Sequence, residues 1–338
     1  YFIIPECVDN GKSLTYNQNN RNTLVRKEGE IMKYESSFKS EADGLEISIM
    51  AVIPDTKPYR GAVQLVHGMS EHKERYLPFM KYLAELGYVT VIHDHRGHGK
   101  SVKHQEDLGF TYGGGAKAML QDIRTVNRKI HTQFPDLPLI LMGHSMGSLA
   151  VRAFVAEHDS CADMLIICGS PSYNTALPLG VGIAKIEKAV LGSRHRSKLI
   201  EIMSFGAGVA KFRKDKNCTA WICSDPKVAK EYKESELCGF TFTDDAYLAL
   251  FELMKRAYDV EHFSCTNPKM PVLFVSGAED PCMINVRHFA KTVQAMRHAG
   301  YRDVKGKLYP GMRHEILNEI GKDQVYHDIA VYMRKKGF

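Results

Sequence analysis

The chain has 338 residues, of which 44% are hydrophobic and 25% are charged, and its formal net charge is +6. These values are ordinary for a globular protein with a sizeable core, and the mild charge and the lack of a nucleic-acid-binding motif argue against a nucleic-acid partner. No apolar run reaches transmembrane length, no secretory signal is recognisable, and the eight cysteines are scattered without a Cys-x-x-Cys pair. We therefore expect a cytoplasmic protein with reduced thiols.

The N-terminal stretch, residues 1–31, is mostly polar and unpatterned, and Met32 precedes the first convincing strand. We expect residues 1–31 to be a poorly ordered or non-native extension, with the natural start near Met32. From Lys33 alternating residues run to Asp43-Gly44 and then resume to Ile49. An Asp-Gly pair between two such runs predicts a β-hairpin.

Strands and helices then alternate along most of the chain. Strand-length apolar runs occupy residues 62–66, 88–92, 137–142, 164–168, 271–276 and 306–309. Helical patterns occupy residues 76–86, 116–131, 149–158 and 286–293, and a last one ends near residue 335. This alternation implies crossover connections, and it predicts an α/β fold with a mostly parallel sheet flanked by helices.

The alternation fails in residues 172–265, which contain helical patterns and no good buried strand. We interpret this stretch as a helical cap inserted between two parts of the core, residues 32–171 and 266–338. Residues 172–216 contain nine Lys and Arg residues but three Asp and Glu residues. The basic side is either merely solvated, or it makes transient contact with an anionic membrane surface, so that the protein is peripheral to the membrane.

Several apolar residues of the predicted cap are candidates for contacts with a substrate. They occur at helical spacing, which is equally typical of residues that form the core. The candidates are Met203, Phe205, Leu250 and Met254.

The segment Gly143-His144-Ser145-Met146-Gly147 follows a strand-length apolar run and precedes a helix-like run. This is the context of a nucleophile elbow, a sharp turn in which the serine adopts strained backbone angles. Gly143 and Gly147 lack a Cβ atom, so the strand and the helix can approach closely. We predict Ser145 as a nucleophile at a helix N-terminus, where the N–H of Met146 would stabilise an oxyanion.

A serine hydroxyl is a weak nucleophile that needs a base within hydrogen-bond reach, and the base needs an orienting carboxylate. In an open parallel sheet, functional groups gather beyond the carboxyl ends of the strands. Asp280 and His314 each follow a predicted strand. The order serine, aspartate, histidine is that of the α/β-hydrolases, so we predict Ser145, Asp280 and His314 as catalytic residues, with Glu279 as the nearest rival for the acid.

Residues after the earlier strands offer two further candidate sites. The second oxyanion donor is expected in the loop after the strand that ends at Val66, where the backbone N–H of Met69 fits. His93, His95 and His98 suggest a metal site by composition, but a strand edge followed by two glycines does not set the geometry of metal ligands. We therefore predict that the reaction needs no metal and no organic cofactor.

Five collinear motifs support this interpretation. They are 67–76 (HGMSEHKERY), 94–101 (DHRGHGKS), 143–147 (GHSMG), 277–281 (GAEDP) and 314–319 (HEILNE). Together they resemble the motifs of monoacylglycerol lipases and bacterial lysophospholipases of the α/β-hydrolase superfamily, a group with serine aminopeptidases among its members. Within the cap, 224–228 and 237–240 are similar to bacterial lysophospholipase-type sequences.

This resemblance implies an α/β-hydrolase fold, a cap over the three catalytic residues, and hydrolysis of carboxylic esters. We expect a small-molecule lipid or ester substrate, either a monoacylglycerol or a lysophospholipid. The alternatives are a short-chain carboxylesterase, an aminopeptidase-type peptidase on the same scaffold, and a non-catalytic binding protein. The peptidase would need a carboxylate in the cap to bind the amine of its substrate.

Overall fold

The computed structural model describes residues 24–28, 31–215 and 217–338. The prediction of a poorly ordered or non-native extension over residues 1–31 therefore falls mainly outside the described residues. Within that range the structure contains the strand β1 (Leu24–Glu28), which pairs antiparallel with β2 (Ile31–Lys39).

Among the described residues, nine strands form one sheet in the order β1-β2-β3-β5-β4-β6-β7-β8-β9. The strands after β2 are β3 (Glu46–Pro54), β4 (Gly61–Val66), β5 (Tyr88–His93), β6 (Leu139–His144), β7 (Met164–Cys168), β8 (Val272–Gly277) and β9 (Val304–Tyr309). All pairs from β5 to β9 are parallel, whereas β1, β2 and β3 pair antiparallel with their neighbours. The predicted mostly parallel sheet is confirmed, as is the hairpin at Asp43-Gly44, which joins β2 to β3.

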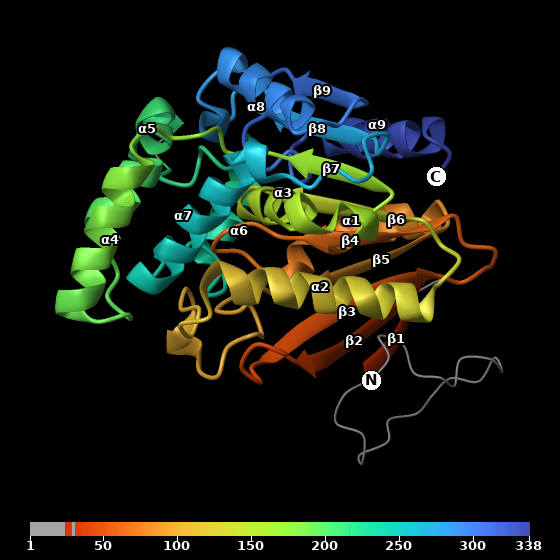
Figure 1. Cartoon of the computed structure of the whole chain (residues 1–338), viewed down its shortest axis with the longest axis horizontal. Coiled ribbons are helices and arrows are strands. Elements are labelled where there is room, and N and C mark those ends of the chain that lie inside the picture. Colours follow the sequence, from red (N-terminus) through yellow and green to blue (C-terminus); the bar gives the residue numbers. More distant parts are fainter. Residues whose placement is uncertain (1–23, 29–30, 216) are drawn as a thin grey trace.

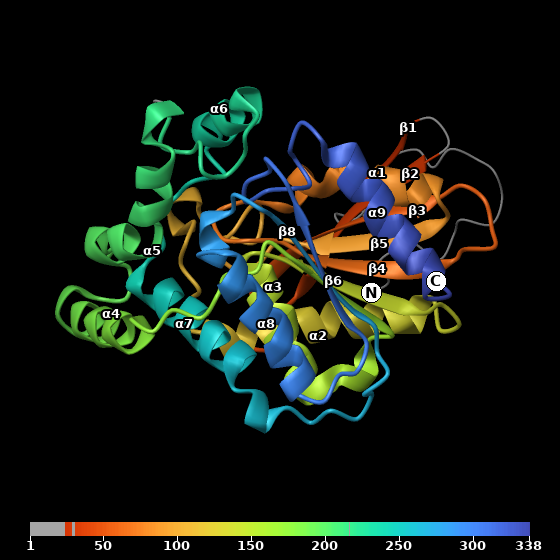
Figure 2. The same ribbon diagram turned by 90° about the horizontal axis from the view of Figure 1, so that it is seen from above.

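Helices cover both faces of the sheet, as Figure 2 shows from above. Helices α1 (Leu77–Glu85) and α9 (Lys322–Lys335) pack on one face, and α2 (Gly115–Gln133), α3 (Met146–His158) and α8 (Val286–His298) pack on the other. Successive strand residues point to opposite faces, so in β6 Leu141 joins the core under α3, while Ile140 and Met142 join the core under α1 and α9. None of the helices in the described part of the chain combines the length and the apolar character needed to cross a bilayer.

In the described residues between β7 and β8, where we predicted a cap, there are four α-helices; we call residues 172–265 the cap segment. They are α4 (Leu177–Leu191), α5 (Lys198–Lys211), α6 (Pro226–Glu234) and α7 (Asp244–Tyr258). Helix α7 packs against α3 and α4 through a buried face that includes Leu253 and Ala257. Helices α4 and α5 stand beyond one end of the sheet (Figure 1).

The register of the parallel strands brings three distant loops together at that end. Val66 of β4 lies opposite Gly143 of β6, so the loop after β4 starts beside the Gly-x-Ser-x-Gly turn. Gly277 of β8 lies opposite Tyr309 of β9, so the loops that carry Asp280 and His314 start side by side. The sheet therefore positions all three loops before any side-chain contact is considered.

Candidate active site

Ser145 occupies the turn between β6 and α3 with φ 51° and ψ −119°, a conformation that non-glycine residues rarely adopt. The glycines on either side are required by close backbone contacts. A Cβ atom on Gly143 would lie 2.3 Å from the carbonyl oxygen of Gly147, and one on Gly147 would lie 2.1 Å from the carbonyl oxygen of Val66. The tight turn therefore holds the Ser145 side chain at the N-terminus of α3.

Ser145, His314 and Asp280 are connected by consecutive hydrogen bonds. His314 Nε2 is 2.8 Å from Ser145 Oγ, and His314 Nδ1 is 3.0 Å from each carboxylate oxygen of Asp280. Asp280 also accepts hydrogen bonds from the Ser276 hydroxyl (3.0 Å) and from the backbone N–H of Cys282 (2.8 Å). Glu279 is exposed to solvent, so Asp280, and not its rival, is the carboxylate that contacts the imidazole.

The two ionisable partners shift each other's pKa in opposite directions. Burial alone would raise the pKa of Asp280, but the charge of His314 and several donated hydrogen bonds lower it below its ordinary value. Burial alone would lower the pKa of His314, but the Asp280 carboxylate raises it above its ordinary value. The arrangement thus combines an ionised carboxylate with a strengthened base, and that base lies within hydrogen-bond reach of a serine hydroxyl.

The backbone N–H groups of Met69 and Met146 are the predicted oxyanion donors, and their neighbours show which of the N–H groups in the described residues are already paired. The N–H of Gly68 donates to the Glu71 carboxylate (2.5 Å) and that of Ser70 donates to His98 Nε2 (3.2 Å), whereas the N–H of Met69 between them has no partner among the described residues. Within the same part of the chain, the N–H of Met146, the first residue of α3, also has none. The assignment of both groups as oxyanion donors stays a prediction that this geometry allows.

Glu71 was not singled out from the sequence, although it lies within the loop predicted to supply an oxyanion donor. It is buried, and the same carboxylate oxygen that binds Gly68 accepts a hydrogen bond from the Tyr76 hydroxyl at 2.9 Å. Its pKa lies well below the ordinary value: burial opposes this shift, but His144 and Arg75 outweigh it. His144 lies between Glu71 Oε1 and the carbonyl oxygen of His314, 3.3 Å from each. Glu71 therefore braces the loop of Met69 against the segment that holds the base.

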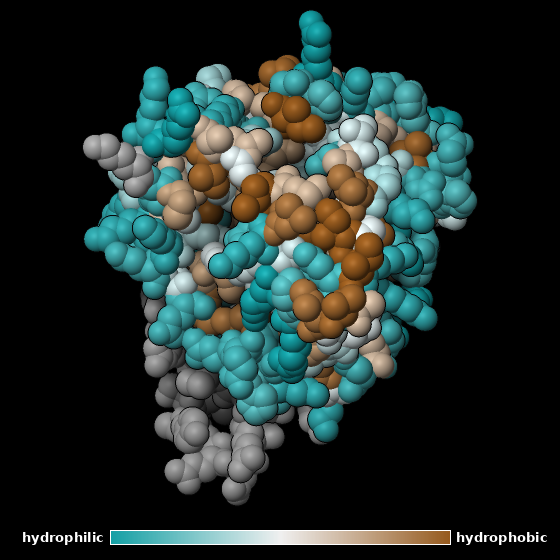
Figure 3. All heavy atoms as spheres, turned by 90° about the vertical axis from the view of Figure 1, so that its left-hand side faces the viewer, coloured by the Kyte–Doolittle hydropathy of each residue, from teal (hydrophilic) through white to brown (hydrophobic). Residues whose placement is uncertain are grey.

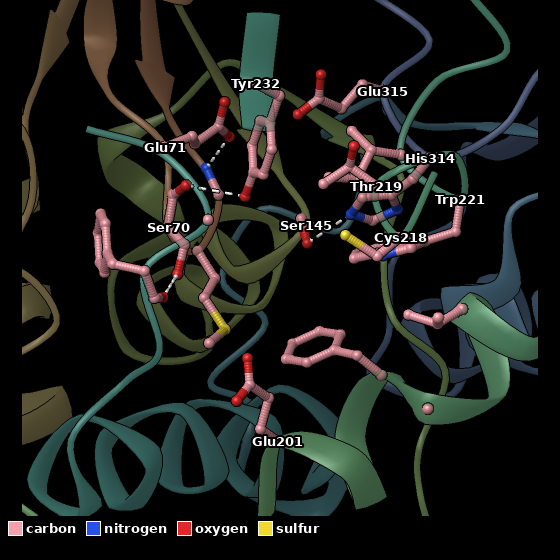
Figure 4. Close-up of a pocket in the computed structure, with 18 of the residues that line it drawn as sticks. Ser70, Glu71, Ser145, Glu201, Cys218, Thr219, Trp221, Tyr232, His314 and Glu315 are labelled. Carbon is pink, nitrogen blue, oxygen red and sulfur yellow. Dashed lines mark hydrogen bonds between the residues drawn. The ribbon is translucent and has the colours of Figure 1, made fainter. Parts of the chain in front are cut away.

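A cavity of about 490 Å³ opens beside Ser145 (Figure 4). Apolar surface dominates its lining, which comes from the loop after β4, from α5 and from residues 218–222. Phe205 of α5 stacks on Trp221 with ring centroids 5.6 Å apart, and Trp221 lies 5.4 Å from the ring of His314. Three carboxylates from distant parts of the chain, Glu71, Glu201 and Glu315, reach the lining.

Of the four cap residues predicted to contact substrate, only Phe205 lies in the lining of this cavity. Met203 is 38% exposed and lies two residues away on α5, so it points to a different side of the helix. Leu250 and Met254, one turn apart on α7, pack against the core around α3. In this structure these three residues are surface or core residues, and the prediction does not match their positions.

The histidines considered as metal ligands pack ring against ring instead. The rings of His93 and His95 are 5.2 Å apart, and those of His95 and His98 are 6.0 Å apart. Burial lowers the pKa of His93 to about 3 and that of His98 to about 4, which keeps both rings neutral. None of the three belongs to the metal-compatible clusters found within the described residues.

Comparison with known proteins agrees with this arrangement. Residues 57–321 match the model of the family described as serine aminopeptidase, S33. The chain belongs to this family. A monoacylglycerol lipase of Mycolicibacterium smegmatis is 27% identical over 309 residues, which cover 88% of this chain and 98% of the relative. A monoglyceride lipase homolog of monkeypox virus is 23% identical and covers 79% of this chain and 85% of the relative.

Solved structures extend the comparison. The crystal structure of a thermostable carboxyl esterase from Bacillus coagulans, in complex with glycerol, aligns with a TM-score of 0.84 and 26% identity over 90% of this chain and 99% of the esterase. A lipase in an open form aligns with a TM-score of 0.82 and 23% identity over the same shares of the two chains, which supports the fold alone. The family, its relatives and the fold make the protein an ester hydrolase of the α/β-hydrolase fold, as the motifs predicted.

Proposed function

We propose that this S33-family protein hydrolyses the ester bond of monoacylglycerols, or of lysophospholipids, through an acyl-enzyme on Ser145. The observation that carries the proposal is the mainly apolar cavity that opens at the Ser145 hydroxyl. An acyl chain placed in it would bury its methylenes against Phe205 and Trp221, and that burial favours long chains over short ones. The monoacylglycerol lipase relative supports the same class of substrate.

The proposed reaction uses the residues described above. His314 takes the proton of Ser145 as the hydroxyl attacks the ester carbonyl, and Asp280 stabilises the imidazolium that forms. The N–H groups of Met69 and Met146 donate to the oxyanion, and His314 then protonates the leaving alcohol. His314 then deprotonates a water molecule, which attacks the acyl carbonyl. The bond between the carbonyl carbon and Ser145 Oγ breaks, His314 returns the proton to Ser145 Oγ, and the fatty acid is released.

A substrate panel tests this function. It contains p-nitrophenyl esters from acetyl to palmitoyl, a monoacylglycerol, lysophosphatidylcholine and an amino-acid anilide. We expect kcat/KM to rise with acyl-chain length, because a longer chain buries more apolar surface in the cavity. We also expect the monoacylglycerol or the lysophospholipid to turn over. Turnover of the short esters alone would contradict the lipid assignment and would make the protein a short-chain carboxylesterase.

One observation favours a second candidate function, that of an aminopeptidase-type peptidase. Glu201 of α5 lies in the lining of the cavity, where one of its carboxylate oxygens accepts a hydrogen bond from the Thr241 hydroxyl at 3.1 Å (Figure 4). It supplies the cap carboxylate that a peptidase would need for the amine of its substrate, and it could equally accept hydrogen bonds from the hydroxyls of glycerol. Turnover of the anilide without ester turnover would favour the peptidase.

We further propose that the cap segment contacts an anionic lipid surface. Large apolar side chains of α4 and α5 are exposed and gather on one face of the molecule (Figure 3). They are Leu179, Ile186, Val190, Leu191, Leu199, Ile202 and Met203. Basic residues such as Lys185 and Lys198 are interspersed in the same helices, and apolar and basic groups on one face together suit an anionic membrane surface.

We expect the double substitution Ile186→Asp, Val190→Asp to weaken binding to phosphatidylglycerol vesicles by about tenfold or more, because it removes two apolar contacts and adds negative charge. Sedimentation with vesicles measures this, and hydrolysis of p-nitrophenyl butyrate in the same samples should not change. Ile320→Asp is the matched control, since Ile320 is 73% exposed but lies outside the cap segment. Equal vesicle binding by the double variant, the control and the wild type would refute the contact.

A further inference from the structure

A second cluster of ionisable side chains lies in the cap segment, away from Ser145. It consists of Glu187 of α4, His195 in the connection to α5, and Asp244, the first residue of α7. One ligand atom of each residue lies within 4.8 Å of those of the other two. His195 Nδ1 is 2.9 Å from Asp244 Oδ2, and the Asp244 side chain is fully buried.

The carboxylates of this cluster are incompletely paired. Asp244 Oδ1 and Glu187 Oε2 are both buried and have no hydrogen-bond partner within the described residues. The neighbouring cations are used elsewhere: Lys188 contacts Asp245 at 2.7 Å, and Arg194 pairs with Asp107. A buried, unpartnered carboxylate oxygen is costly, so these oxygens point to a missing positive partner.

We propose that Glu187, His195 and Asp244 form a binding site for a divalent transition-metal ion such as Zn²⁺. Two carboxylates and one imidazole are a donor set that zinc accepts, with water completing the coordination. His195 Nδ1 and Asp244 Oδ2 share a hydrogen bond at 2.9 Å, so metal binding would displace the proton between them and move the two atoms apart to the roughly 3.4 Å expected of tetrahedral zinc ligands. The His195 side chain is 31% exposed, which leaves a path by which the ion can enter.

Such an ion would link the cap segment to the body of the molecule. Its three ligands come from α4, from the connection that follows it, and from the start of α7, which packs on the core helix α3. Binding would therefore connect the exposed helix α4 directly to the body of the molecule. Because the site forms only in the folded chain, added metal should raise the unfolding temperature.

A different metal-compatible cluster complicates the experiment. Asp280, Cys282 and His314 also bring three ligand atoms within 4.8 Å, and Cys282 Sγ is 4.0 Å from His314 Nε2. Zinc held there would contact the catalytic base. A thiolate ligand gives Co²⁺ an intense charge-transfer absorption, which carboxylate and imidazole ligands do not, so Co²⁺ spectra distinguish the two clusters.

The test titrates the metal-free full chain with ZnCl₂ by calorimetry and with CoCl₂ by absorption. We expect one Zn²⁺ to bind to the wild type, and Glu187→Gln and His195→Ala each to weaken binding by at least about tenfold. Asp259→Asn is the matched control, because Asp259 and His262 form an exposed pair at 2.7 Å that belongs to none of the metal-compatible clusters found among the described residues. That variant should bind Zn²⁺ as the wild type does.

The proposal fails if the wild type binds no Zn²⁺ at 100-fold molar excess, or if both ligand variants bind it unchanged. It also fails if the Co²⁺ complex shows the thiolate band and Cys282→Ala abolishes binding, since the ion would then sit beside His314. Circular dichroism of the metal-free variants checks that they fold. If His195→Ala does not fold, the nearly isosteric Glu187→Gln still tests the proposal. None of these readouts depends on the substrate proposed above.

Discussion

Replacing Ser145 with alanine is expected to lower kcat for ester hydrolysis by roughly 10⁴- to 10⁶-fold, and to abolish labelling by a fluorophosphonate. The alanine has no hydroxyl to attack the carbonyl, although the cavity and the two N–H donors would remain. Hydrolysis of p-nitrophenyl esters measures the first effect, and gel-based detection of a fluorescent fluorophosphonate measures the second.

Ser264→Ala is a suitable control, because Ser264 is exposed and lies at the end of the cap segment away from the cavity. It should leave both readouts unchanged. Persistent labelling of Ser145→Ala, or a loss of activity below about tenfold, would mean that another residue is the nucleophile. Failure of Ser145 in the wild type to react with the fluorophosphonate would instead revive the interpretation as a binding protein.

Asp280→Asn is expected to lower kcat by about 10³- to 10⁴-fold while the protein stays folded. The amide is nearly isosteric, but it does not stabilise the imidazolium, and it can hold His314 in the wrong tautomer. Glu279→Gln is the matched control, because Glu279 is the exposed neighbour that does not contact the imidazole. Comparable losses in the two variants would show that the carboxylate is misassigned.

The pH profile gives an independent readout of the same pair. His314 acts as a base only when neutral, and Asp280 raises its pKa, so kcat/KM of the wild type should fall on the acid side at a pH above the ordinary imidazole value of about 6.5. Without the carboxylate, burial dominates and lowers that pKa. In Asp280→Asn, the fall of kcat/KM on the acid side should therefore move to lower pH. If it does not move, the fall reflects the titration of a group other than His314.

The fold and the central elements of the site were predictable because their signals are local. The strand, the elbow and the helix around Ser145 lie within about twenty consecutive residues, and the glycines that the turn needs mark it in the sequence. Asp280 and His314 could be selected because each follows a strand of a parallel sheet, and strand ends converge whatever the side chains are. Backbone periodicity and chain order therefore carried that part of the prediction.

The lining of the cavity could not be predicted in the same way. Met203 and Phe205 are equally apolar and two residues apart, but only the packing of α5 decides which of them faces Ser145. Leu250 and Met254 have the spacing of a lining helix, but they are partly buried against the hydrophobic core instead. The sequence pattern shows that one face of a helix is apolar, but the packing of the neighbouring elements determines what covers that face.

The sequence by itself predicted the strand, turn and helix of the elbow, the three candidate catalytic residues, and a helical insertion in the part of the chain that lies between β7 and β8. Only the tertiary structure showed that Glu71 braces the base through His144, and that Glu187, His195 and Asp244 meet in the cap. The reason is physical: local hydrogen bonding and side-chain periodicity produce strands and turns, whereas contacts between polar residues far apart in the chain depend on how whole helices pack.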